Sequence, residues 1–157
     1  MKIFFDTEFI DTGREIYPIS IGMVTLAGEE YYAEVDDVPW DLAHPWVMEN
    51  VHSKLLGGEC VKSRDEIARE ISFFVGRNPE FWAYVACYDW MLLVQLYGRL
   101  LDTPRGWPMV CHDLKLYAHY FHLNIYPNAD NDAHNALVDA HWNRQTYGDL
   151  MRQKAAR

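Results

Sequence analysis

Five residues in this sequence have side chains that could hold a divalent cation and move a proton: Asp6, Glu8, Asp89, His134 and Asp139. Asp6 and Glu8 lie two residues apart in FDTEF, a stretch that is otherwise largely apolar. In a strand they would share one face, roughly 6.5–7 Å apart. Two like charges beside a hydrophobic run repel each other and resist desolvation unless a positive charge joins them. The pair therefore predicts a bound cation.

Two further carboxylates are placed to join that cation. Asp89 directly follows the apolar stretch 81–86, which we expect to be a buried strand. Asp139 lies inside the expected last helix, where an aspartate is mildly unfavourable, so a functional role would explain its presence there. Carboxylates are the ligands that Mg²⁺ prefers, and two such ions about 3.5–4 Å apart can clamp the attacking and leaving oxygens of a phosphoryl transfer. The predicted cofactor is two Mg²⁺ ions, with Mn²⁺ as a substitute.

The spacing between His134 and Asp139 restricts how both could face one site. Five residues at about 100° each would place them some 140° apart on a continuous helix. Both can face the site only if His134 precedes the regular helix, and the turn-rich residues NADND just before it favour this. An imidazole titrates near neutral pH, so His134 is a natural general base for activating a water.

The elements that must position these side chains follow from periodicity and turn signals. In chain order we expect three strands (ending near residue 9, at 18–26 and at 29–36), a helix at 63–76, a strand at 81–86, a helix from about 89, a short strand near 109–111, a helix around 114–121 and a last helix at about 135–151. Ser63 and Glu66 have the spacing of a capping box. This order predicts an α/β fold with a mixed five-stranded sheet flanked by helices and a central first strand. The carboxyl end of that strand, where Asp6 and Glu8 lie, is where such sheets bind ligands.

Composition is compatible with one globular enzyme domain. The chain has 157 residues, half of them hydrophobic, so we expect a single domain over 1–152 and a frayed tail at 153–157. The start predicts neither a signal peptide nor a membrane span. Three cysteines without a CxxC pair indicate a reduced, cytoplasmic compartment. Two bound dications would reduce the formal charge from −9 to −5, so acidity does not exclude a nucleic-acid substrate.

The stretches FDTEF, YDW and HNALVDA, in this order, resemble the three motifs of the His-bearing branch of the DEDD exonuclease superfamily (DEDDh). The resemblance runs from Asp6 to Asp139. The stretches DTEFI, ISIG, YYA and AYVACYDW look closest to the exoribonuclease AS family, which is bacterial, poly(A)-directed and dimeric. Oligoribonuclease, RNase T and proofreading exonucleases are more distantly similar. The resemblance implies an RNase H-like fold and removal of nucleotides from 3' ends with two metal ions.

Carried over by position, the resemblance also implies roles for individual residues. Asp6 would bridge both ions, Glu8 and Asp139 would complete the tighter site, and Asp89 would serve the second ion mostly through water. Glu8 would also position the water, and His134 would deprotonate it. Thr7, Phe9 and Ile10 would touch the 3'-terminal nucleotide, with Phe9 in apolar contact with its base or sugar.

The resulting hypothesis is a two-metal 3'-5' exoribonuclease that converts single-stranded RNA, with A-rich 3' ends as candidates, into 5'-mononucleotides. Homodimer formation is implied by the family alone. Three alternatives stay open: a DNA exonuclease of the proofreading or phage type, an RNase H-like endonuclease, and a catalytically silent exonuclease-like binding subunit. Competition between RNA and DNA substrates would separate a DNA exonuclease from the hypothesis. Internal rather than terminal cuts would identify an endonuclease, and metal-induced stabilisation would argue against a silent binding subunit.

Several other residues have competing structural interpretations. Asp89 could simply cap its helix, and His112–Asp113 is better placed for a cap than for a catalytic pair. We expect His141 to be structural, and Trp46 and Trp90 to be core residues that could alternatively stack a base. The sequence does not choose among the scattered basic residues that could hold phosphate: Lys54, Lys62, Arg64, Arg99, Arg105, Lys115 and Arg144.

Overall fold

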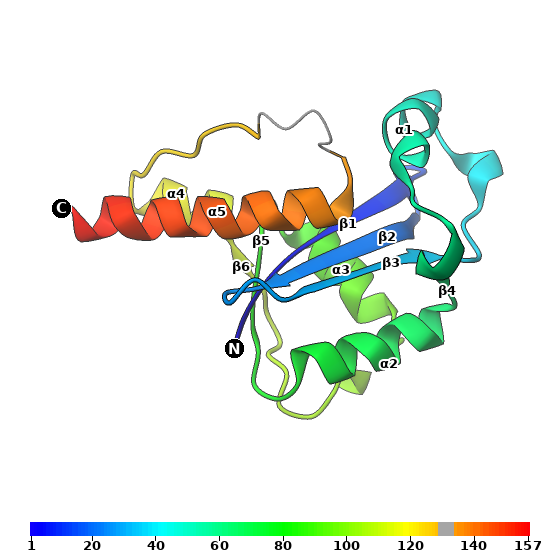
Figure 1. The fold of residues 1–157 in the computed structure, drawn as a ribbon, viewed down its shortest axis with the longest axis horizontal. Helices are drawn as coiled ribbons and strands as arrows, with labels where there is room; N and C mark the ends of the chain where they lie inside the picture. Colours follow the sequence, from blue (N-terminus) through cyan, green and yellow to red (C-terminus); the bar gives the residue numbers. More distant parts are fainter. Residues whose placement is uncertain (129–133) are drawn as a thin grey trace.

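The computed structural model describes residues 1–128 and 134–157, which form one mixed sheet with helices on both faces (Figure 1). The strand order is β4-β3-β2-β1-β5-β6. The strands are β1 (Lys2–Asp11), β2 (Ile16–Thr25), β3 (Glu30–Val35), β4 (Val61–Lys62), β5 (Glu80–Ala83) and β6 (His112–Asp113), and the α-helices are α1 (Pro45–Asn50), α2 (Arg64–Val75), α3 (Cys87–Gln95), α4 (Leu114–Tyr120) and α5 (Ala136–Ala155).

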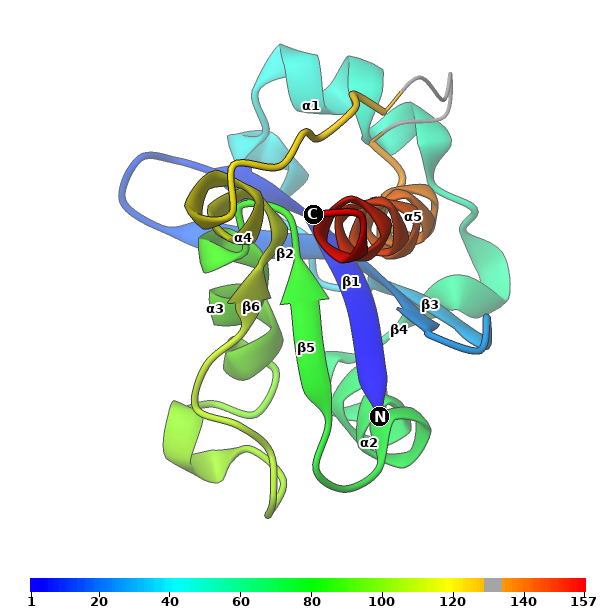
Figure 2. The same cartoon turned by 90° about the vertical axis from the view of Figure 1, so that its left-hand side faces the viewer.

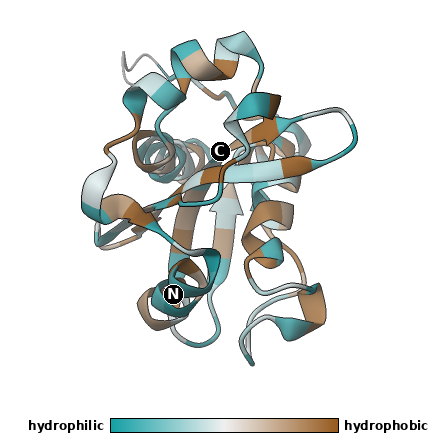
Figure 3. Cartoon of the chain, turned by 90° about the vertical axis from the view of Figure 1, so that its right-hand side faces the viewer, coloured by the Kyte–Doolittle hydropathy of each residue, from teal (hydrophilic) through white to brown (hydrophobic). Residues whose placement is uncertain are grey.

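β1 lies inside the sheet, as its apolar sequence predicts. It pairs antiparallel with β2 over almost its whole length, and parallel with β5 only from Lys2 to Phe4. β2 continues antiparallel to β3, which confirms the predicted hairpin. The β1–β2 connection forms the hydrophilic loop that protrudes from the sheet in Figure 3.

Successive side chains of β1 point to opposite faces of the sheet and pack into two separate hydrophobic cores. Ile3 and Phe5 pack with α2 and α3 on one face, and Phe4 packs with α4 and α5 on the other. Figure 2 shows α5 lying across one face of the sheet with α2 and α3 on the opposite side. Because Asp6 and Glu8 continue the Phe4 register, they belong to the α5 face.

The helices start where their sequences indicate. Ser63 and Glu66 form the predicted capping box of α2. Asn135 caps α5 by accepting hydrogen bonds from the main-chain N–H groups of Leu137 and Val138. The buried side of α5 is small and polar rather than leucine-rich, which explains its weak apolar periodicity: its buried residues are Ala136, Ala140, Asn143, Thr146 and Leu150.

Three predictions about the fold need correction. The sheet has six strands rather than five, because the two-residue β4 is too short to produce a pattern. β5 ends at Ala83, earlier than predicted, because the chain turns sharply at Val85 (φ 55°). The tail expected to be frayed is helical to Ala155, and Arg157 donates to the carbonyls of Phe121 and His122. The loop predicted at NADND falls largely on residues 129–133, outside the described residues.

Two observations concern the predicted cellular context. No helix within 1–128 or 134–157 is long and apolar enough to cross a membrane. Cys60, Cys87 and Cys111 are free thiols. Cytoplasmic location stays a prediction.

Candidate active site

The cleft that holds the predicted residues opens where β1 and β5 separate. Beyond Phe4 the two strands no longer pair, and side chains form hydrogen bonds with the main-chain groups of β1 instead. Asn143 of α5 donates to the Phe5 carbonyl at 2.9 Å, and Asp89 of α3 accepts from the Thr7 N–H at 2.9 Å. The Thr7 hydroxyl donates to the same Asp89 oxygen at 2.7 Å. Asn143 and Asp89, from two different helices, therefore satisfy main-chain hydrogen-bonding groups of β1 next to its acidic side chains.

Asp89 does not cap α3, so the alternative that this residue has only a capping role is wrong. It lies in the first turn of α3, and Ala86 is the N-cap. Its side chain is buried, and the position suits an anion because a helix N-terminus is electropositive. Burial nevertheless raises the pKa of Asp89 to about 6, against the lowering effect of the hydrogen bonds from Thr7.

The pKa values of the acidic residues of β1 are raised by both burial and neighbouring negative charges. Burial raises the pKa of Asp6 well above its usual value, and the neighbouring charges of Asp89, Glu8 and Asp139 raise it further. Burial and the charge of Asp139 raise the pKa of Glu8 to about 8, partly offset by the positive charge of Lys54. Asp6, Glu8, Asp89 and Asp139 line the same cleft, and the mutual repulsion of these carboxylates would favour a bound cation there.

Gly22 lets α5 bring Asp139 to that site. Gly22 of β2 is the register partner of Asp6. A Cβ at this position would lie 2.3 Å from the main-chain atoms of Ala136 and Leu137. Only glycine therefore permits the first turn of α5 to rest directly on the sheet, and Asp139 lies in that turn.

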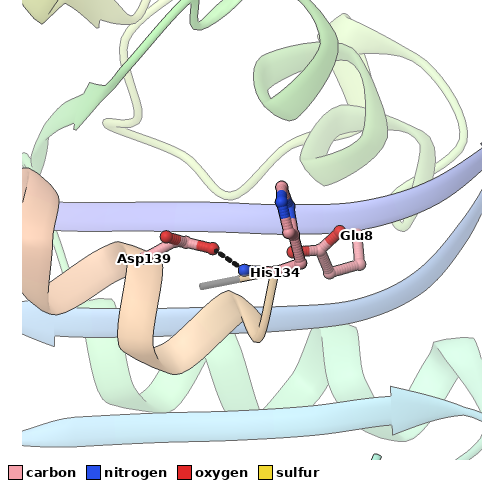
Figure 4. A group of neighbouring side chains, drawn as sticks. All are labelled: Glu8, His134 and Asp139. Atoms are coloured by element: carbon pink, nitrogen blue, oxygen red, sulfur yellow. Dashed lines mark hydrogen bonds between the residues drawn. The ribbon is translucent and has the colours of Figure 1, made fainter. Parts of the chain in front are cut away.

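His134 lies outside the helix, as its spacing from Asp139 predicted. It has a left-handed conformation (φ 71°), and α5 begins two residues later. Its main-chain N–H donates to Asp139 Oδ2 at 2.7 Å, and Asn128 donates to Asp139 Oδ1 at 2.7 Å. Figure 4 shows Asp139 on α5, His134 on the turn before it, and Glu8 close by. The ligand atoms of these three side chains lie within 4.8 Å of one another, so they could hold one metal ion.

The carboxylates and His134 line a cleft of about 390 Å³. Its apolar lining includes Phe9 and Tyr88, whose rings stack at 5.2 Å between centroids and 9° between planes. Val85 also lines it and has φ 55°, a rare conformation for a β-branched residue. Trp142 and Tyr84 meet edge-to-face at 5.0 Å on another part of the lining.

The three predicted substrate contacts have different surroundings. Phe9 and Thr7 line the cleft, although the Thr7 hydroxyl is engaged by Asp89. Ile10 does not line it: its side chain is 0% exposed and packs with Ile19 and Val51. The contact of Ile10 with the nucleotide stays a prediction, and its buried side chain is not part of the described lining of this cleft.

Other candidates have structural roles. Asp113 caps α4 by accepting from the Leu116 N–H, and it also accepts from the Ala86 N–H in the turn before α3. His141 pairs with Glu30 at 2.8 Å. Trp90 packs against Phe81. The sequence analysis did not identify Asn128 and Asn143. It used the stretch ISIG only for the family resemblance and did not predict that its glycine, Gly22, allows α5 to approach β2 closely.

Sequence comparison adds an independent observation. The family model described as the 3'-5' exoribonuclease Rv2179c-like domain matches residues 1–151. The 3'-5' exoribonuclease Rv2179c of Mycobacterium tuberculosis strain H37Rv is 35% identical over 146 residues, which cover 89% of this chain and 87% of the relative. The 3'-5' exoribonuclease MT2234.1 of strain CDC 1551 matches with the same identity and coverage.

Structure comparison identifies the fold. Zinc-bound E. coli exonuclease I in complex with single-stranded DNA matches with a TM-score of 0.69 and 13% identity, over 99% of this chain and 41% of the exonuclease. Exonuclease I of Methylocaldum szegediense matches with a TM-score of 0.68 and 17% identity, over 99% and 41% of the two chains. This chain thus corresponds to less than half of those enzymes, and it shares with them the RNase H-like fold predicted from its motifs.

Proposed function

The chain belongs to the Rv2179c-like 3'-5' exoribonuclease family, and from this premise we propose that it removes nucleotides from the 3' end of single-stranded RNA by metal-dependent hydrolysis. The observation that carries the proposal is the convergence of four carboxylates and one imidazole in a single cleft. The products would be 5'-mononucleotides and an RNA shortened by one residue at each step.

The donor set fits two divalent ions such as Mg²⁺ or Mn²⁺. By the family resemblance, Asp6, Glu8 and Asp139 would hold one ion and Asp6 with Asp89 the other. All four are oxygen donors, and three have raised pKa values that bound cations would lower. When bound, such ions supply positive charge to the phosphate that reacts. Asn128 and the His134 N–H already orient the Asp139 carboxylate.

His134 is the proposed general base. Its imidazole would take the proton of the attacking water, whose oxygen then bonds to the terminal phosphorus as the bond to the 3'-oxygen of the preceding nucleotide breaks. That oxygen leaves as a 3'-hydroxyl after gaining a proton from solvent. The exposed position of His134 at the cleft allows the acquired proton to return to water between cycles.

The apolar lining suits a nucleoside rather than a phosphate. The stacked Phe9 and Tyr88 offer ring surface to the base or sugar of the terminal nucleotide. The cleft volume of about 390 Å³ lies within the usual range for small-ligand sites, about 300–1,000 Å³. Preference for RNA over DNA rests on family membership. Preference for adenine and homodimer formation rest on the resemblance to the exoribonuclease AS family, and cytoplasmic location rests on the cysteine content.

The test uses single-stranded oligonucleotides labelled at the 5' end: A-rich RNA, mixed RNA and the matching DNA, each with Mg²⁺, Mn²⁺ or EDTA. We expect a ladder that shortens from the 3' end, depends on metal, is fastest on RNA and is lost in Asp6→Asn and Asp139→Asn. Asp41→Asn, which changes an exposed carboxylate outside the cleft, is the matched control and should leave the ladder unchanged.

Each competing function predicts another pattern. Internal fragments would indicate an endonuclease, and faster loss of DNA would indicate a DNA exonuclease. Uncut RNA and DNA under every metal condition would contradict the proposal and favour a binding subunit.

A further inference from the structure

The imidazole of His134 has a neighbour that no catalytic scheme requires. The indole of Trp46 meets it edge-to-face, with 4.9 Å between ring centroids and 81° between planes. Trp46 belongs to α1, about ninety residues earlier in the chain. Aromatic rings in this geometry attract each other beyond the area they bury.

The main chain of Trp46 is held by its own segment. Its main-chain N–H donates to His44 Nδ1 at 3.1 Å, and its carbonyl accepts from Asn50 Nδ2 at 2.9 Å. At the end of α1, Val51 is buried against Ile10 of β1. Trp46 is therefore tied to the strand that carries Glu8.

A second contact joins this segment to the turn that carries His134. Asn135, the residue after His134, caps α5 with its Oδ1 and donates from Nδ2 to the Lys54 carbonyl at 3.4 Å. The segment from Trp46 to Lys54 thus touches the turn at two successive residues, once through a ring and once through a main-chain carbonyl.

The position of Trp46 relative to the cleft separates two possible roles. Among the described residues, His134 lines the cleft and Trp46 does not. A base-stacking tryptophan would have to present its ring to the substrate. Trp46 presents it to His134, although the residue is 47% exposed.

We propose that Trp46 is a positioning residue: it supports the imidazole of His134 and so determines where this base stands relative to Glu8 and Asp139. The inference rests on the proposed function, because it assigns a role within the same reaction. A base on a left-handed turn with an exposed side chain needs outside support, because displacement of a catalytic group by about 1 Å can lower the rate about 100-fold. The main-chain bond from His134 to Asp139 fixes the backbone; Trp46 fixes the ring.

The test is a double-mutant cycle measured under single-turnover conditions on A-rich RNA with Mg²⁺. Trp46→Ala should lower the maximal rate about 10- to 100-fold with little change in the RNA concentration needed for half-saturation. In a His134→Gln background, the same substitution should change the residual rate less than about twofold, because its effect is transmitted through His134. Trp46→Phe should recover most of the rate, because phenylalanine keeps an aromatic edge.

Two controls exclude a general structural effect. Met48→Ala alters another exposed apolar side chain of α1 and should leave the rate unchanged. In proton NMR, the His134 ring signals should shift in Trp46→Ala, because they lose the ring current of the indole, and stay near their wild-type positions in Met48→Ala.

The results that would overturn the inference are distinct. An unchanged rate in Trp46→Ala would refute it, and so would weaker RNA binding that persists in the His134→Gln background, which is the result expected if Trp46 stacks a base. A wild-type protein that leaves RNA uncut would instead refute the proposed function, and the inference with it.

Discussion

The two walls of the cleft are built by different means. On one wall Asp6 and Glu8 project from a central strand, and hydrogen bonds from Asn143 and to Asp89 complete the main chain of that strand. On the other wall His134 occupies a left-handed turn, where its main-chain N–H donates to Asp139 and its exposed ring contacts Trp46.

This difference separates two requirements of the chemistry. The strand wall concentrates negative charge where burial makes it costly, so its stability and its metal affinity are coupled. The turn wall holds a group that must exchange protons with water, so it stays exposed and depends on a few side-chain contacts. Substitutions on the strand wall should therefore change both stability and activity, and those on the turn wall mainly the rate.

The largest effect is expected at Asp6. Asp6→Asn should lower the rate of RNA cleavage about 1,000-fold or more, because the substitution removes a charge from the centre of the carboxylate cluster. The same substitution should raise the melting temperature of the metal-free protein, because a buried, repelled charge disappears. Activity assays and thermal unfolding in EDTA measure the two effects. A lower melting temperature would show that the strand wall is not electrostatically strained.

The next effect tests how closely the two walls approach. Gly22→Ala should destabilise the protein by about 1–3 kcal/mol and lower activity, because the new Cβ would collide with main-chain atoms of α5. Gly148→Ala, in the middle of α5, is the matched control: its Cβ meets only the flexible end of Arg152. It should stabilise the helix by up to about 1 kcal/mol. Equal unfolding midpoints for the two variants would contradict the close approach of α5.

The contrast between the walls also explains what could be predicted from the sequence. Alternation and turn signals were enough to predict β1, the hairpin and the acidic pair, because strand registers follow a period of two. The position of His134 before α5 followed from its angular distance to Asp139. The supporting contacts of Asn143, Asn128 and Trp46 could not be predicted, because they depend on packing, and those of Asn143 and Trp46 also join residues far apart in the chain. The burial of Ile10 could not be predicted either, because its packing partners Ile19 and Val51 come from other segments of the chain.

A smaller effect is expected at Thr7. Thr7→Val keeps the main-chain bond to Asp89 and removes the hydroxyl bond at 2.7 Å. We expect a loss of about 1 kcal/mol in stability and about a 10-fold lower rate, because Asp89 is less well oriented and its pKa rises further. The wild-type protein is the reference for both measurements. If Thr7→Val matched it in both rate and unfolding midpoint, the hydroxyl would have no role.

The smallest effect concerns pH in the absence of RNA. The pKa of Glu8 is raised to about 8, so between its ordinary value and pH 8 the folded protein holds more protons than the unfolded chain. Its contribution to stability therefore falls as pH rises through this window. Mn²⁺ binds the deprotonated carboxylates, so the increase in melting temperature that it causes should be larger at pH 8 than at pH 5.5. A shift that is the same at both pH values would contradict the binding of Mn²⁺ by these carboxylates.

The most direct test of the central claim is to digest A-rich RNA in water enriched in ¹⁸O, with Mg²⁺, and to analyse the products by mass spectrometry. The claim that a water activated in this cleft attacks the terminal phosphodiester predicts nucleoside 5'-monophosphates that carry one ¹⁸O each, from the earliest time point. Unlabelled cyclic phosphates, labelled internal fragments or intact RNA would contradict it.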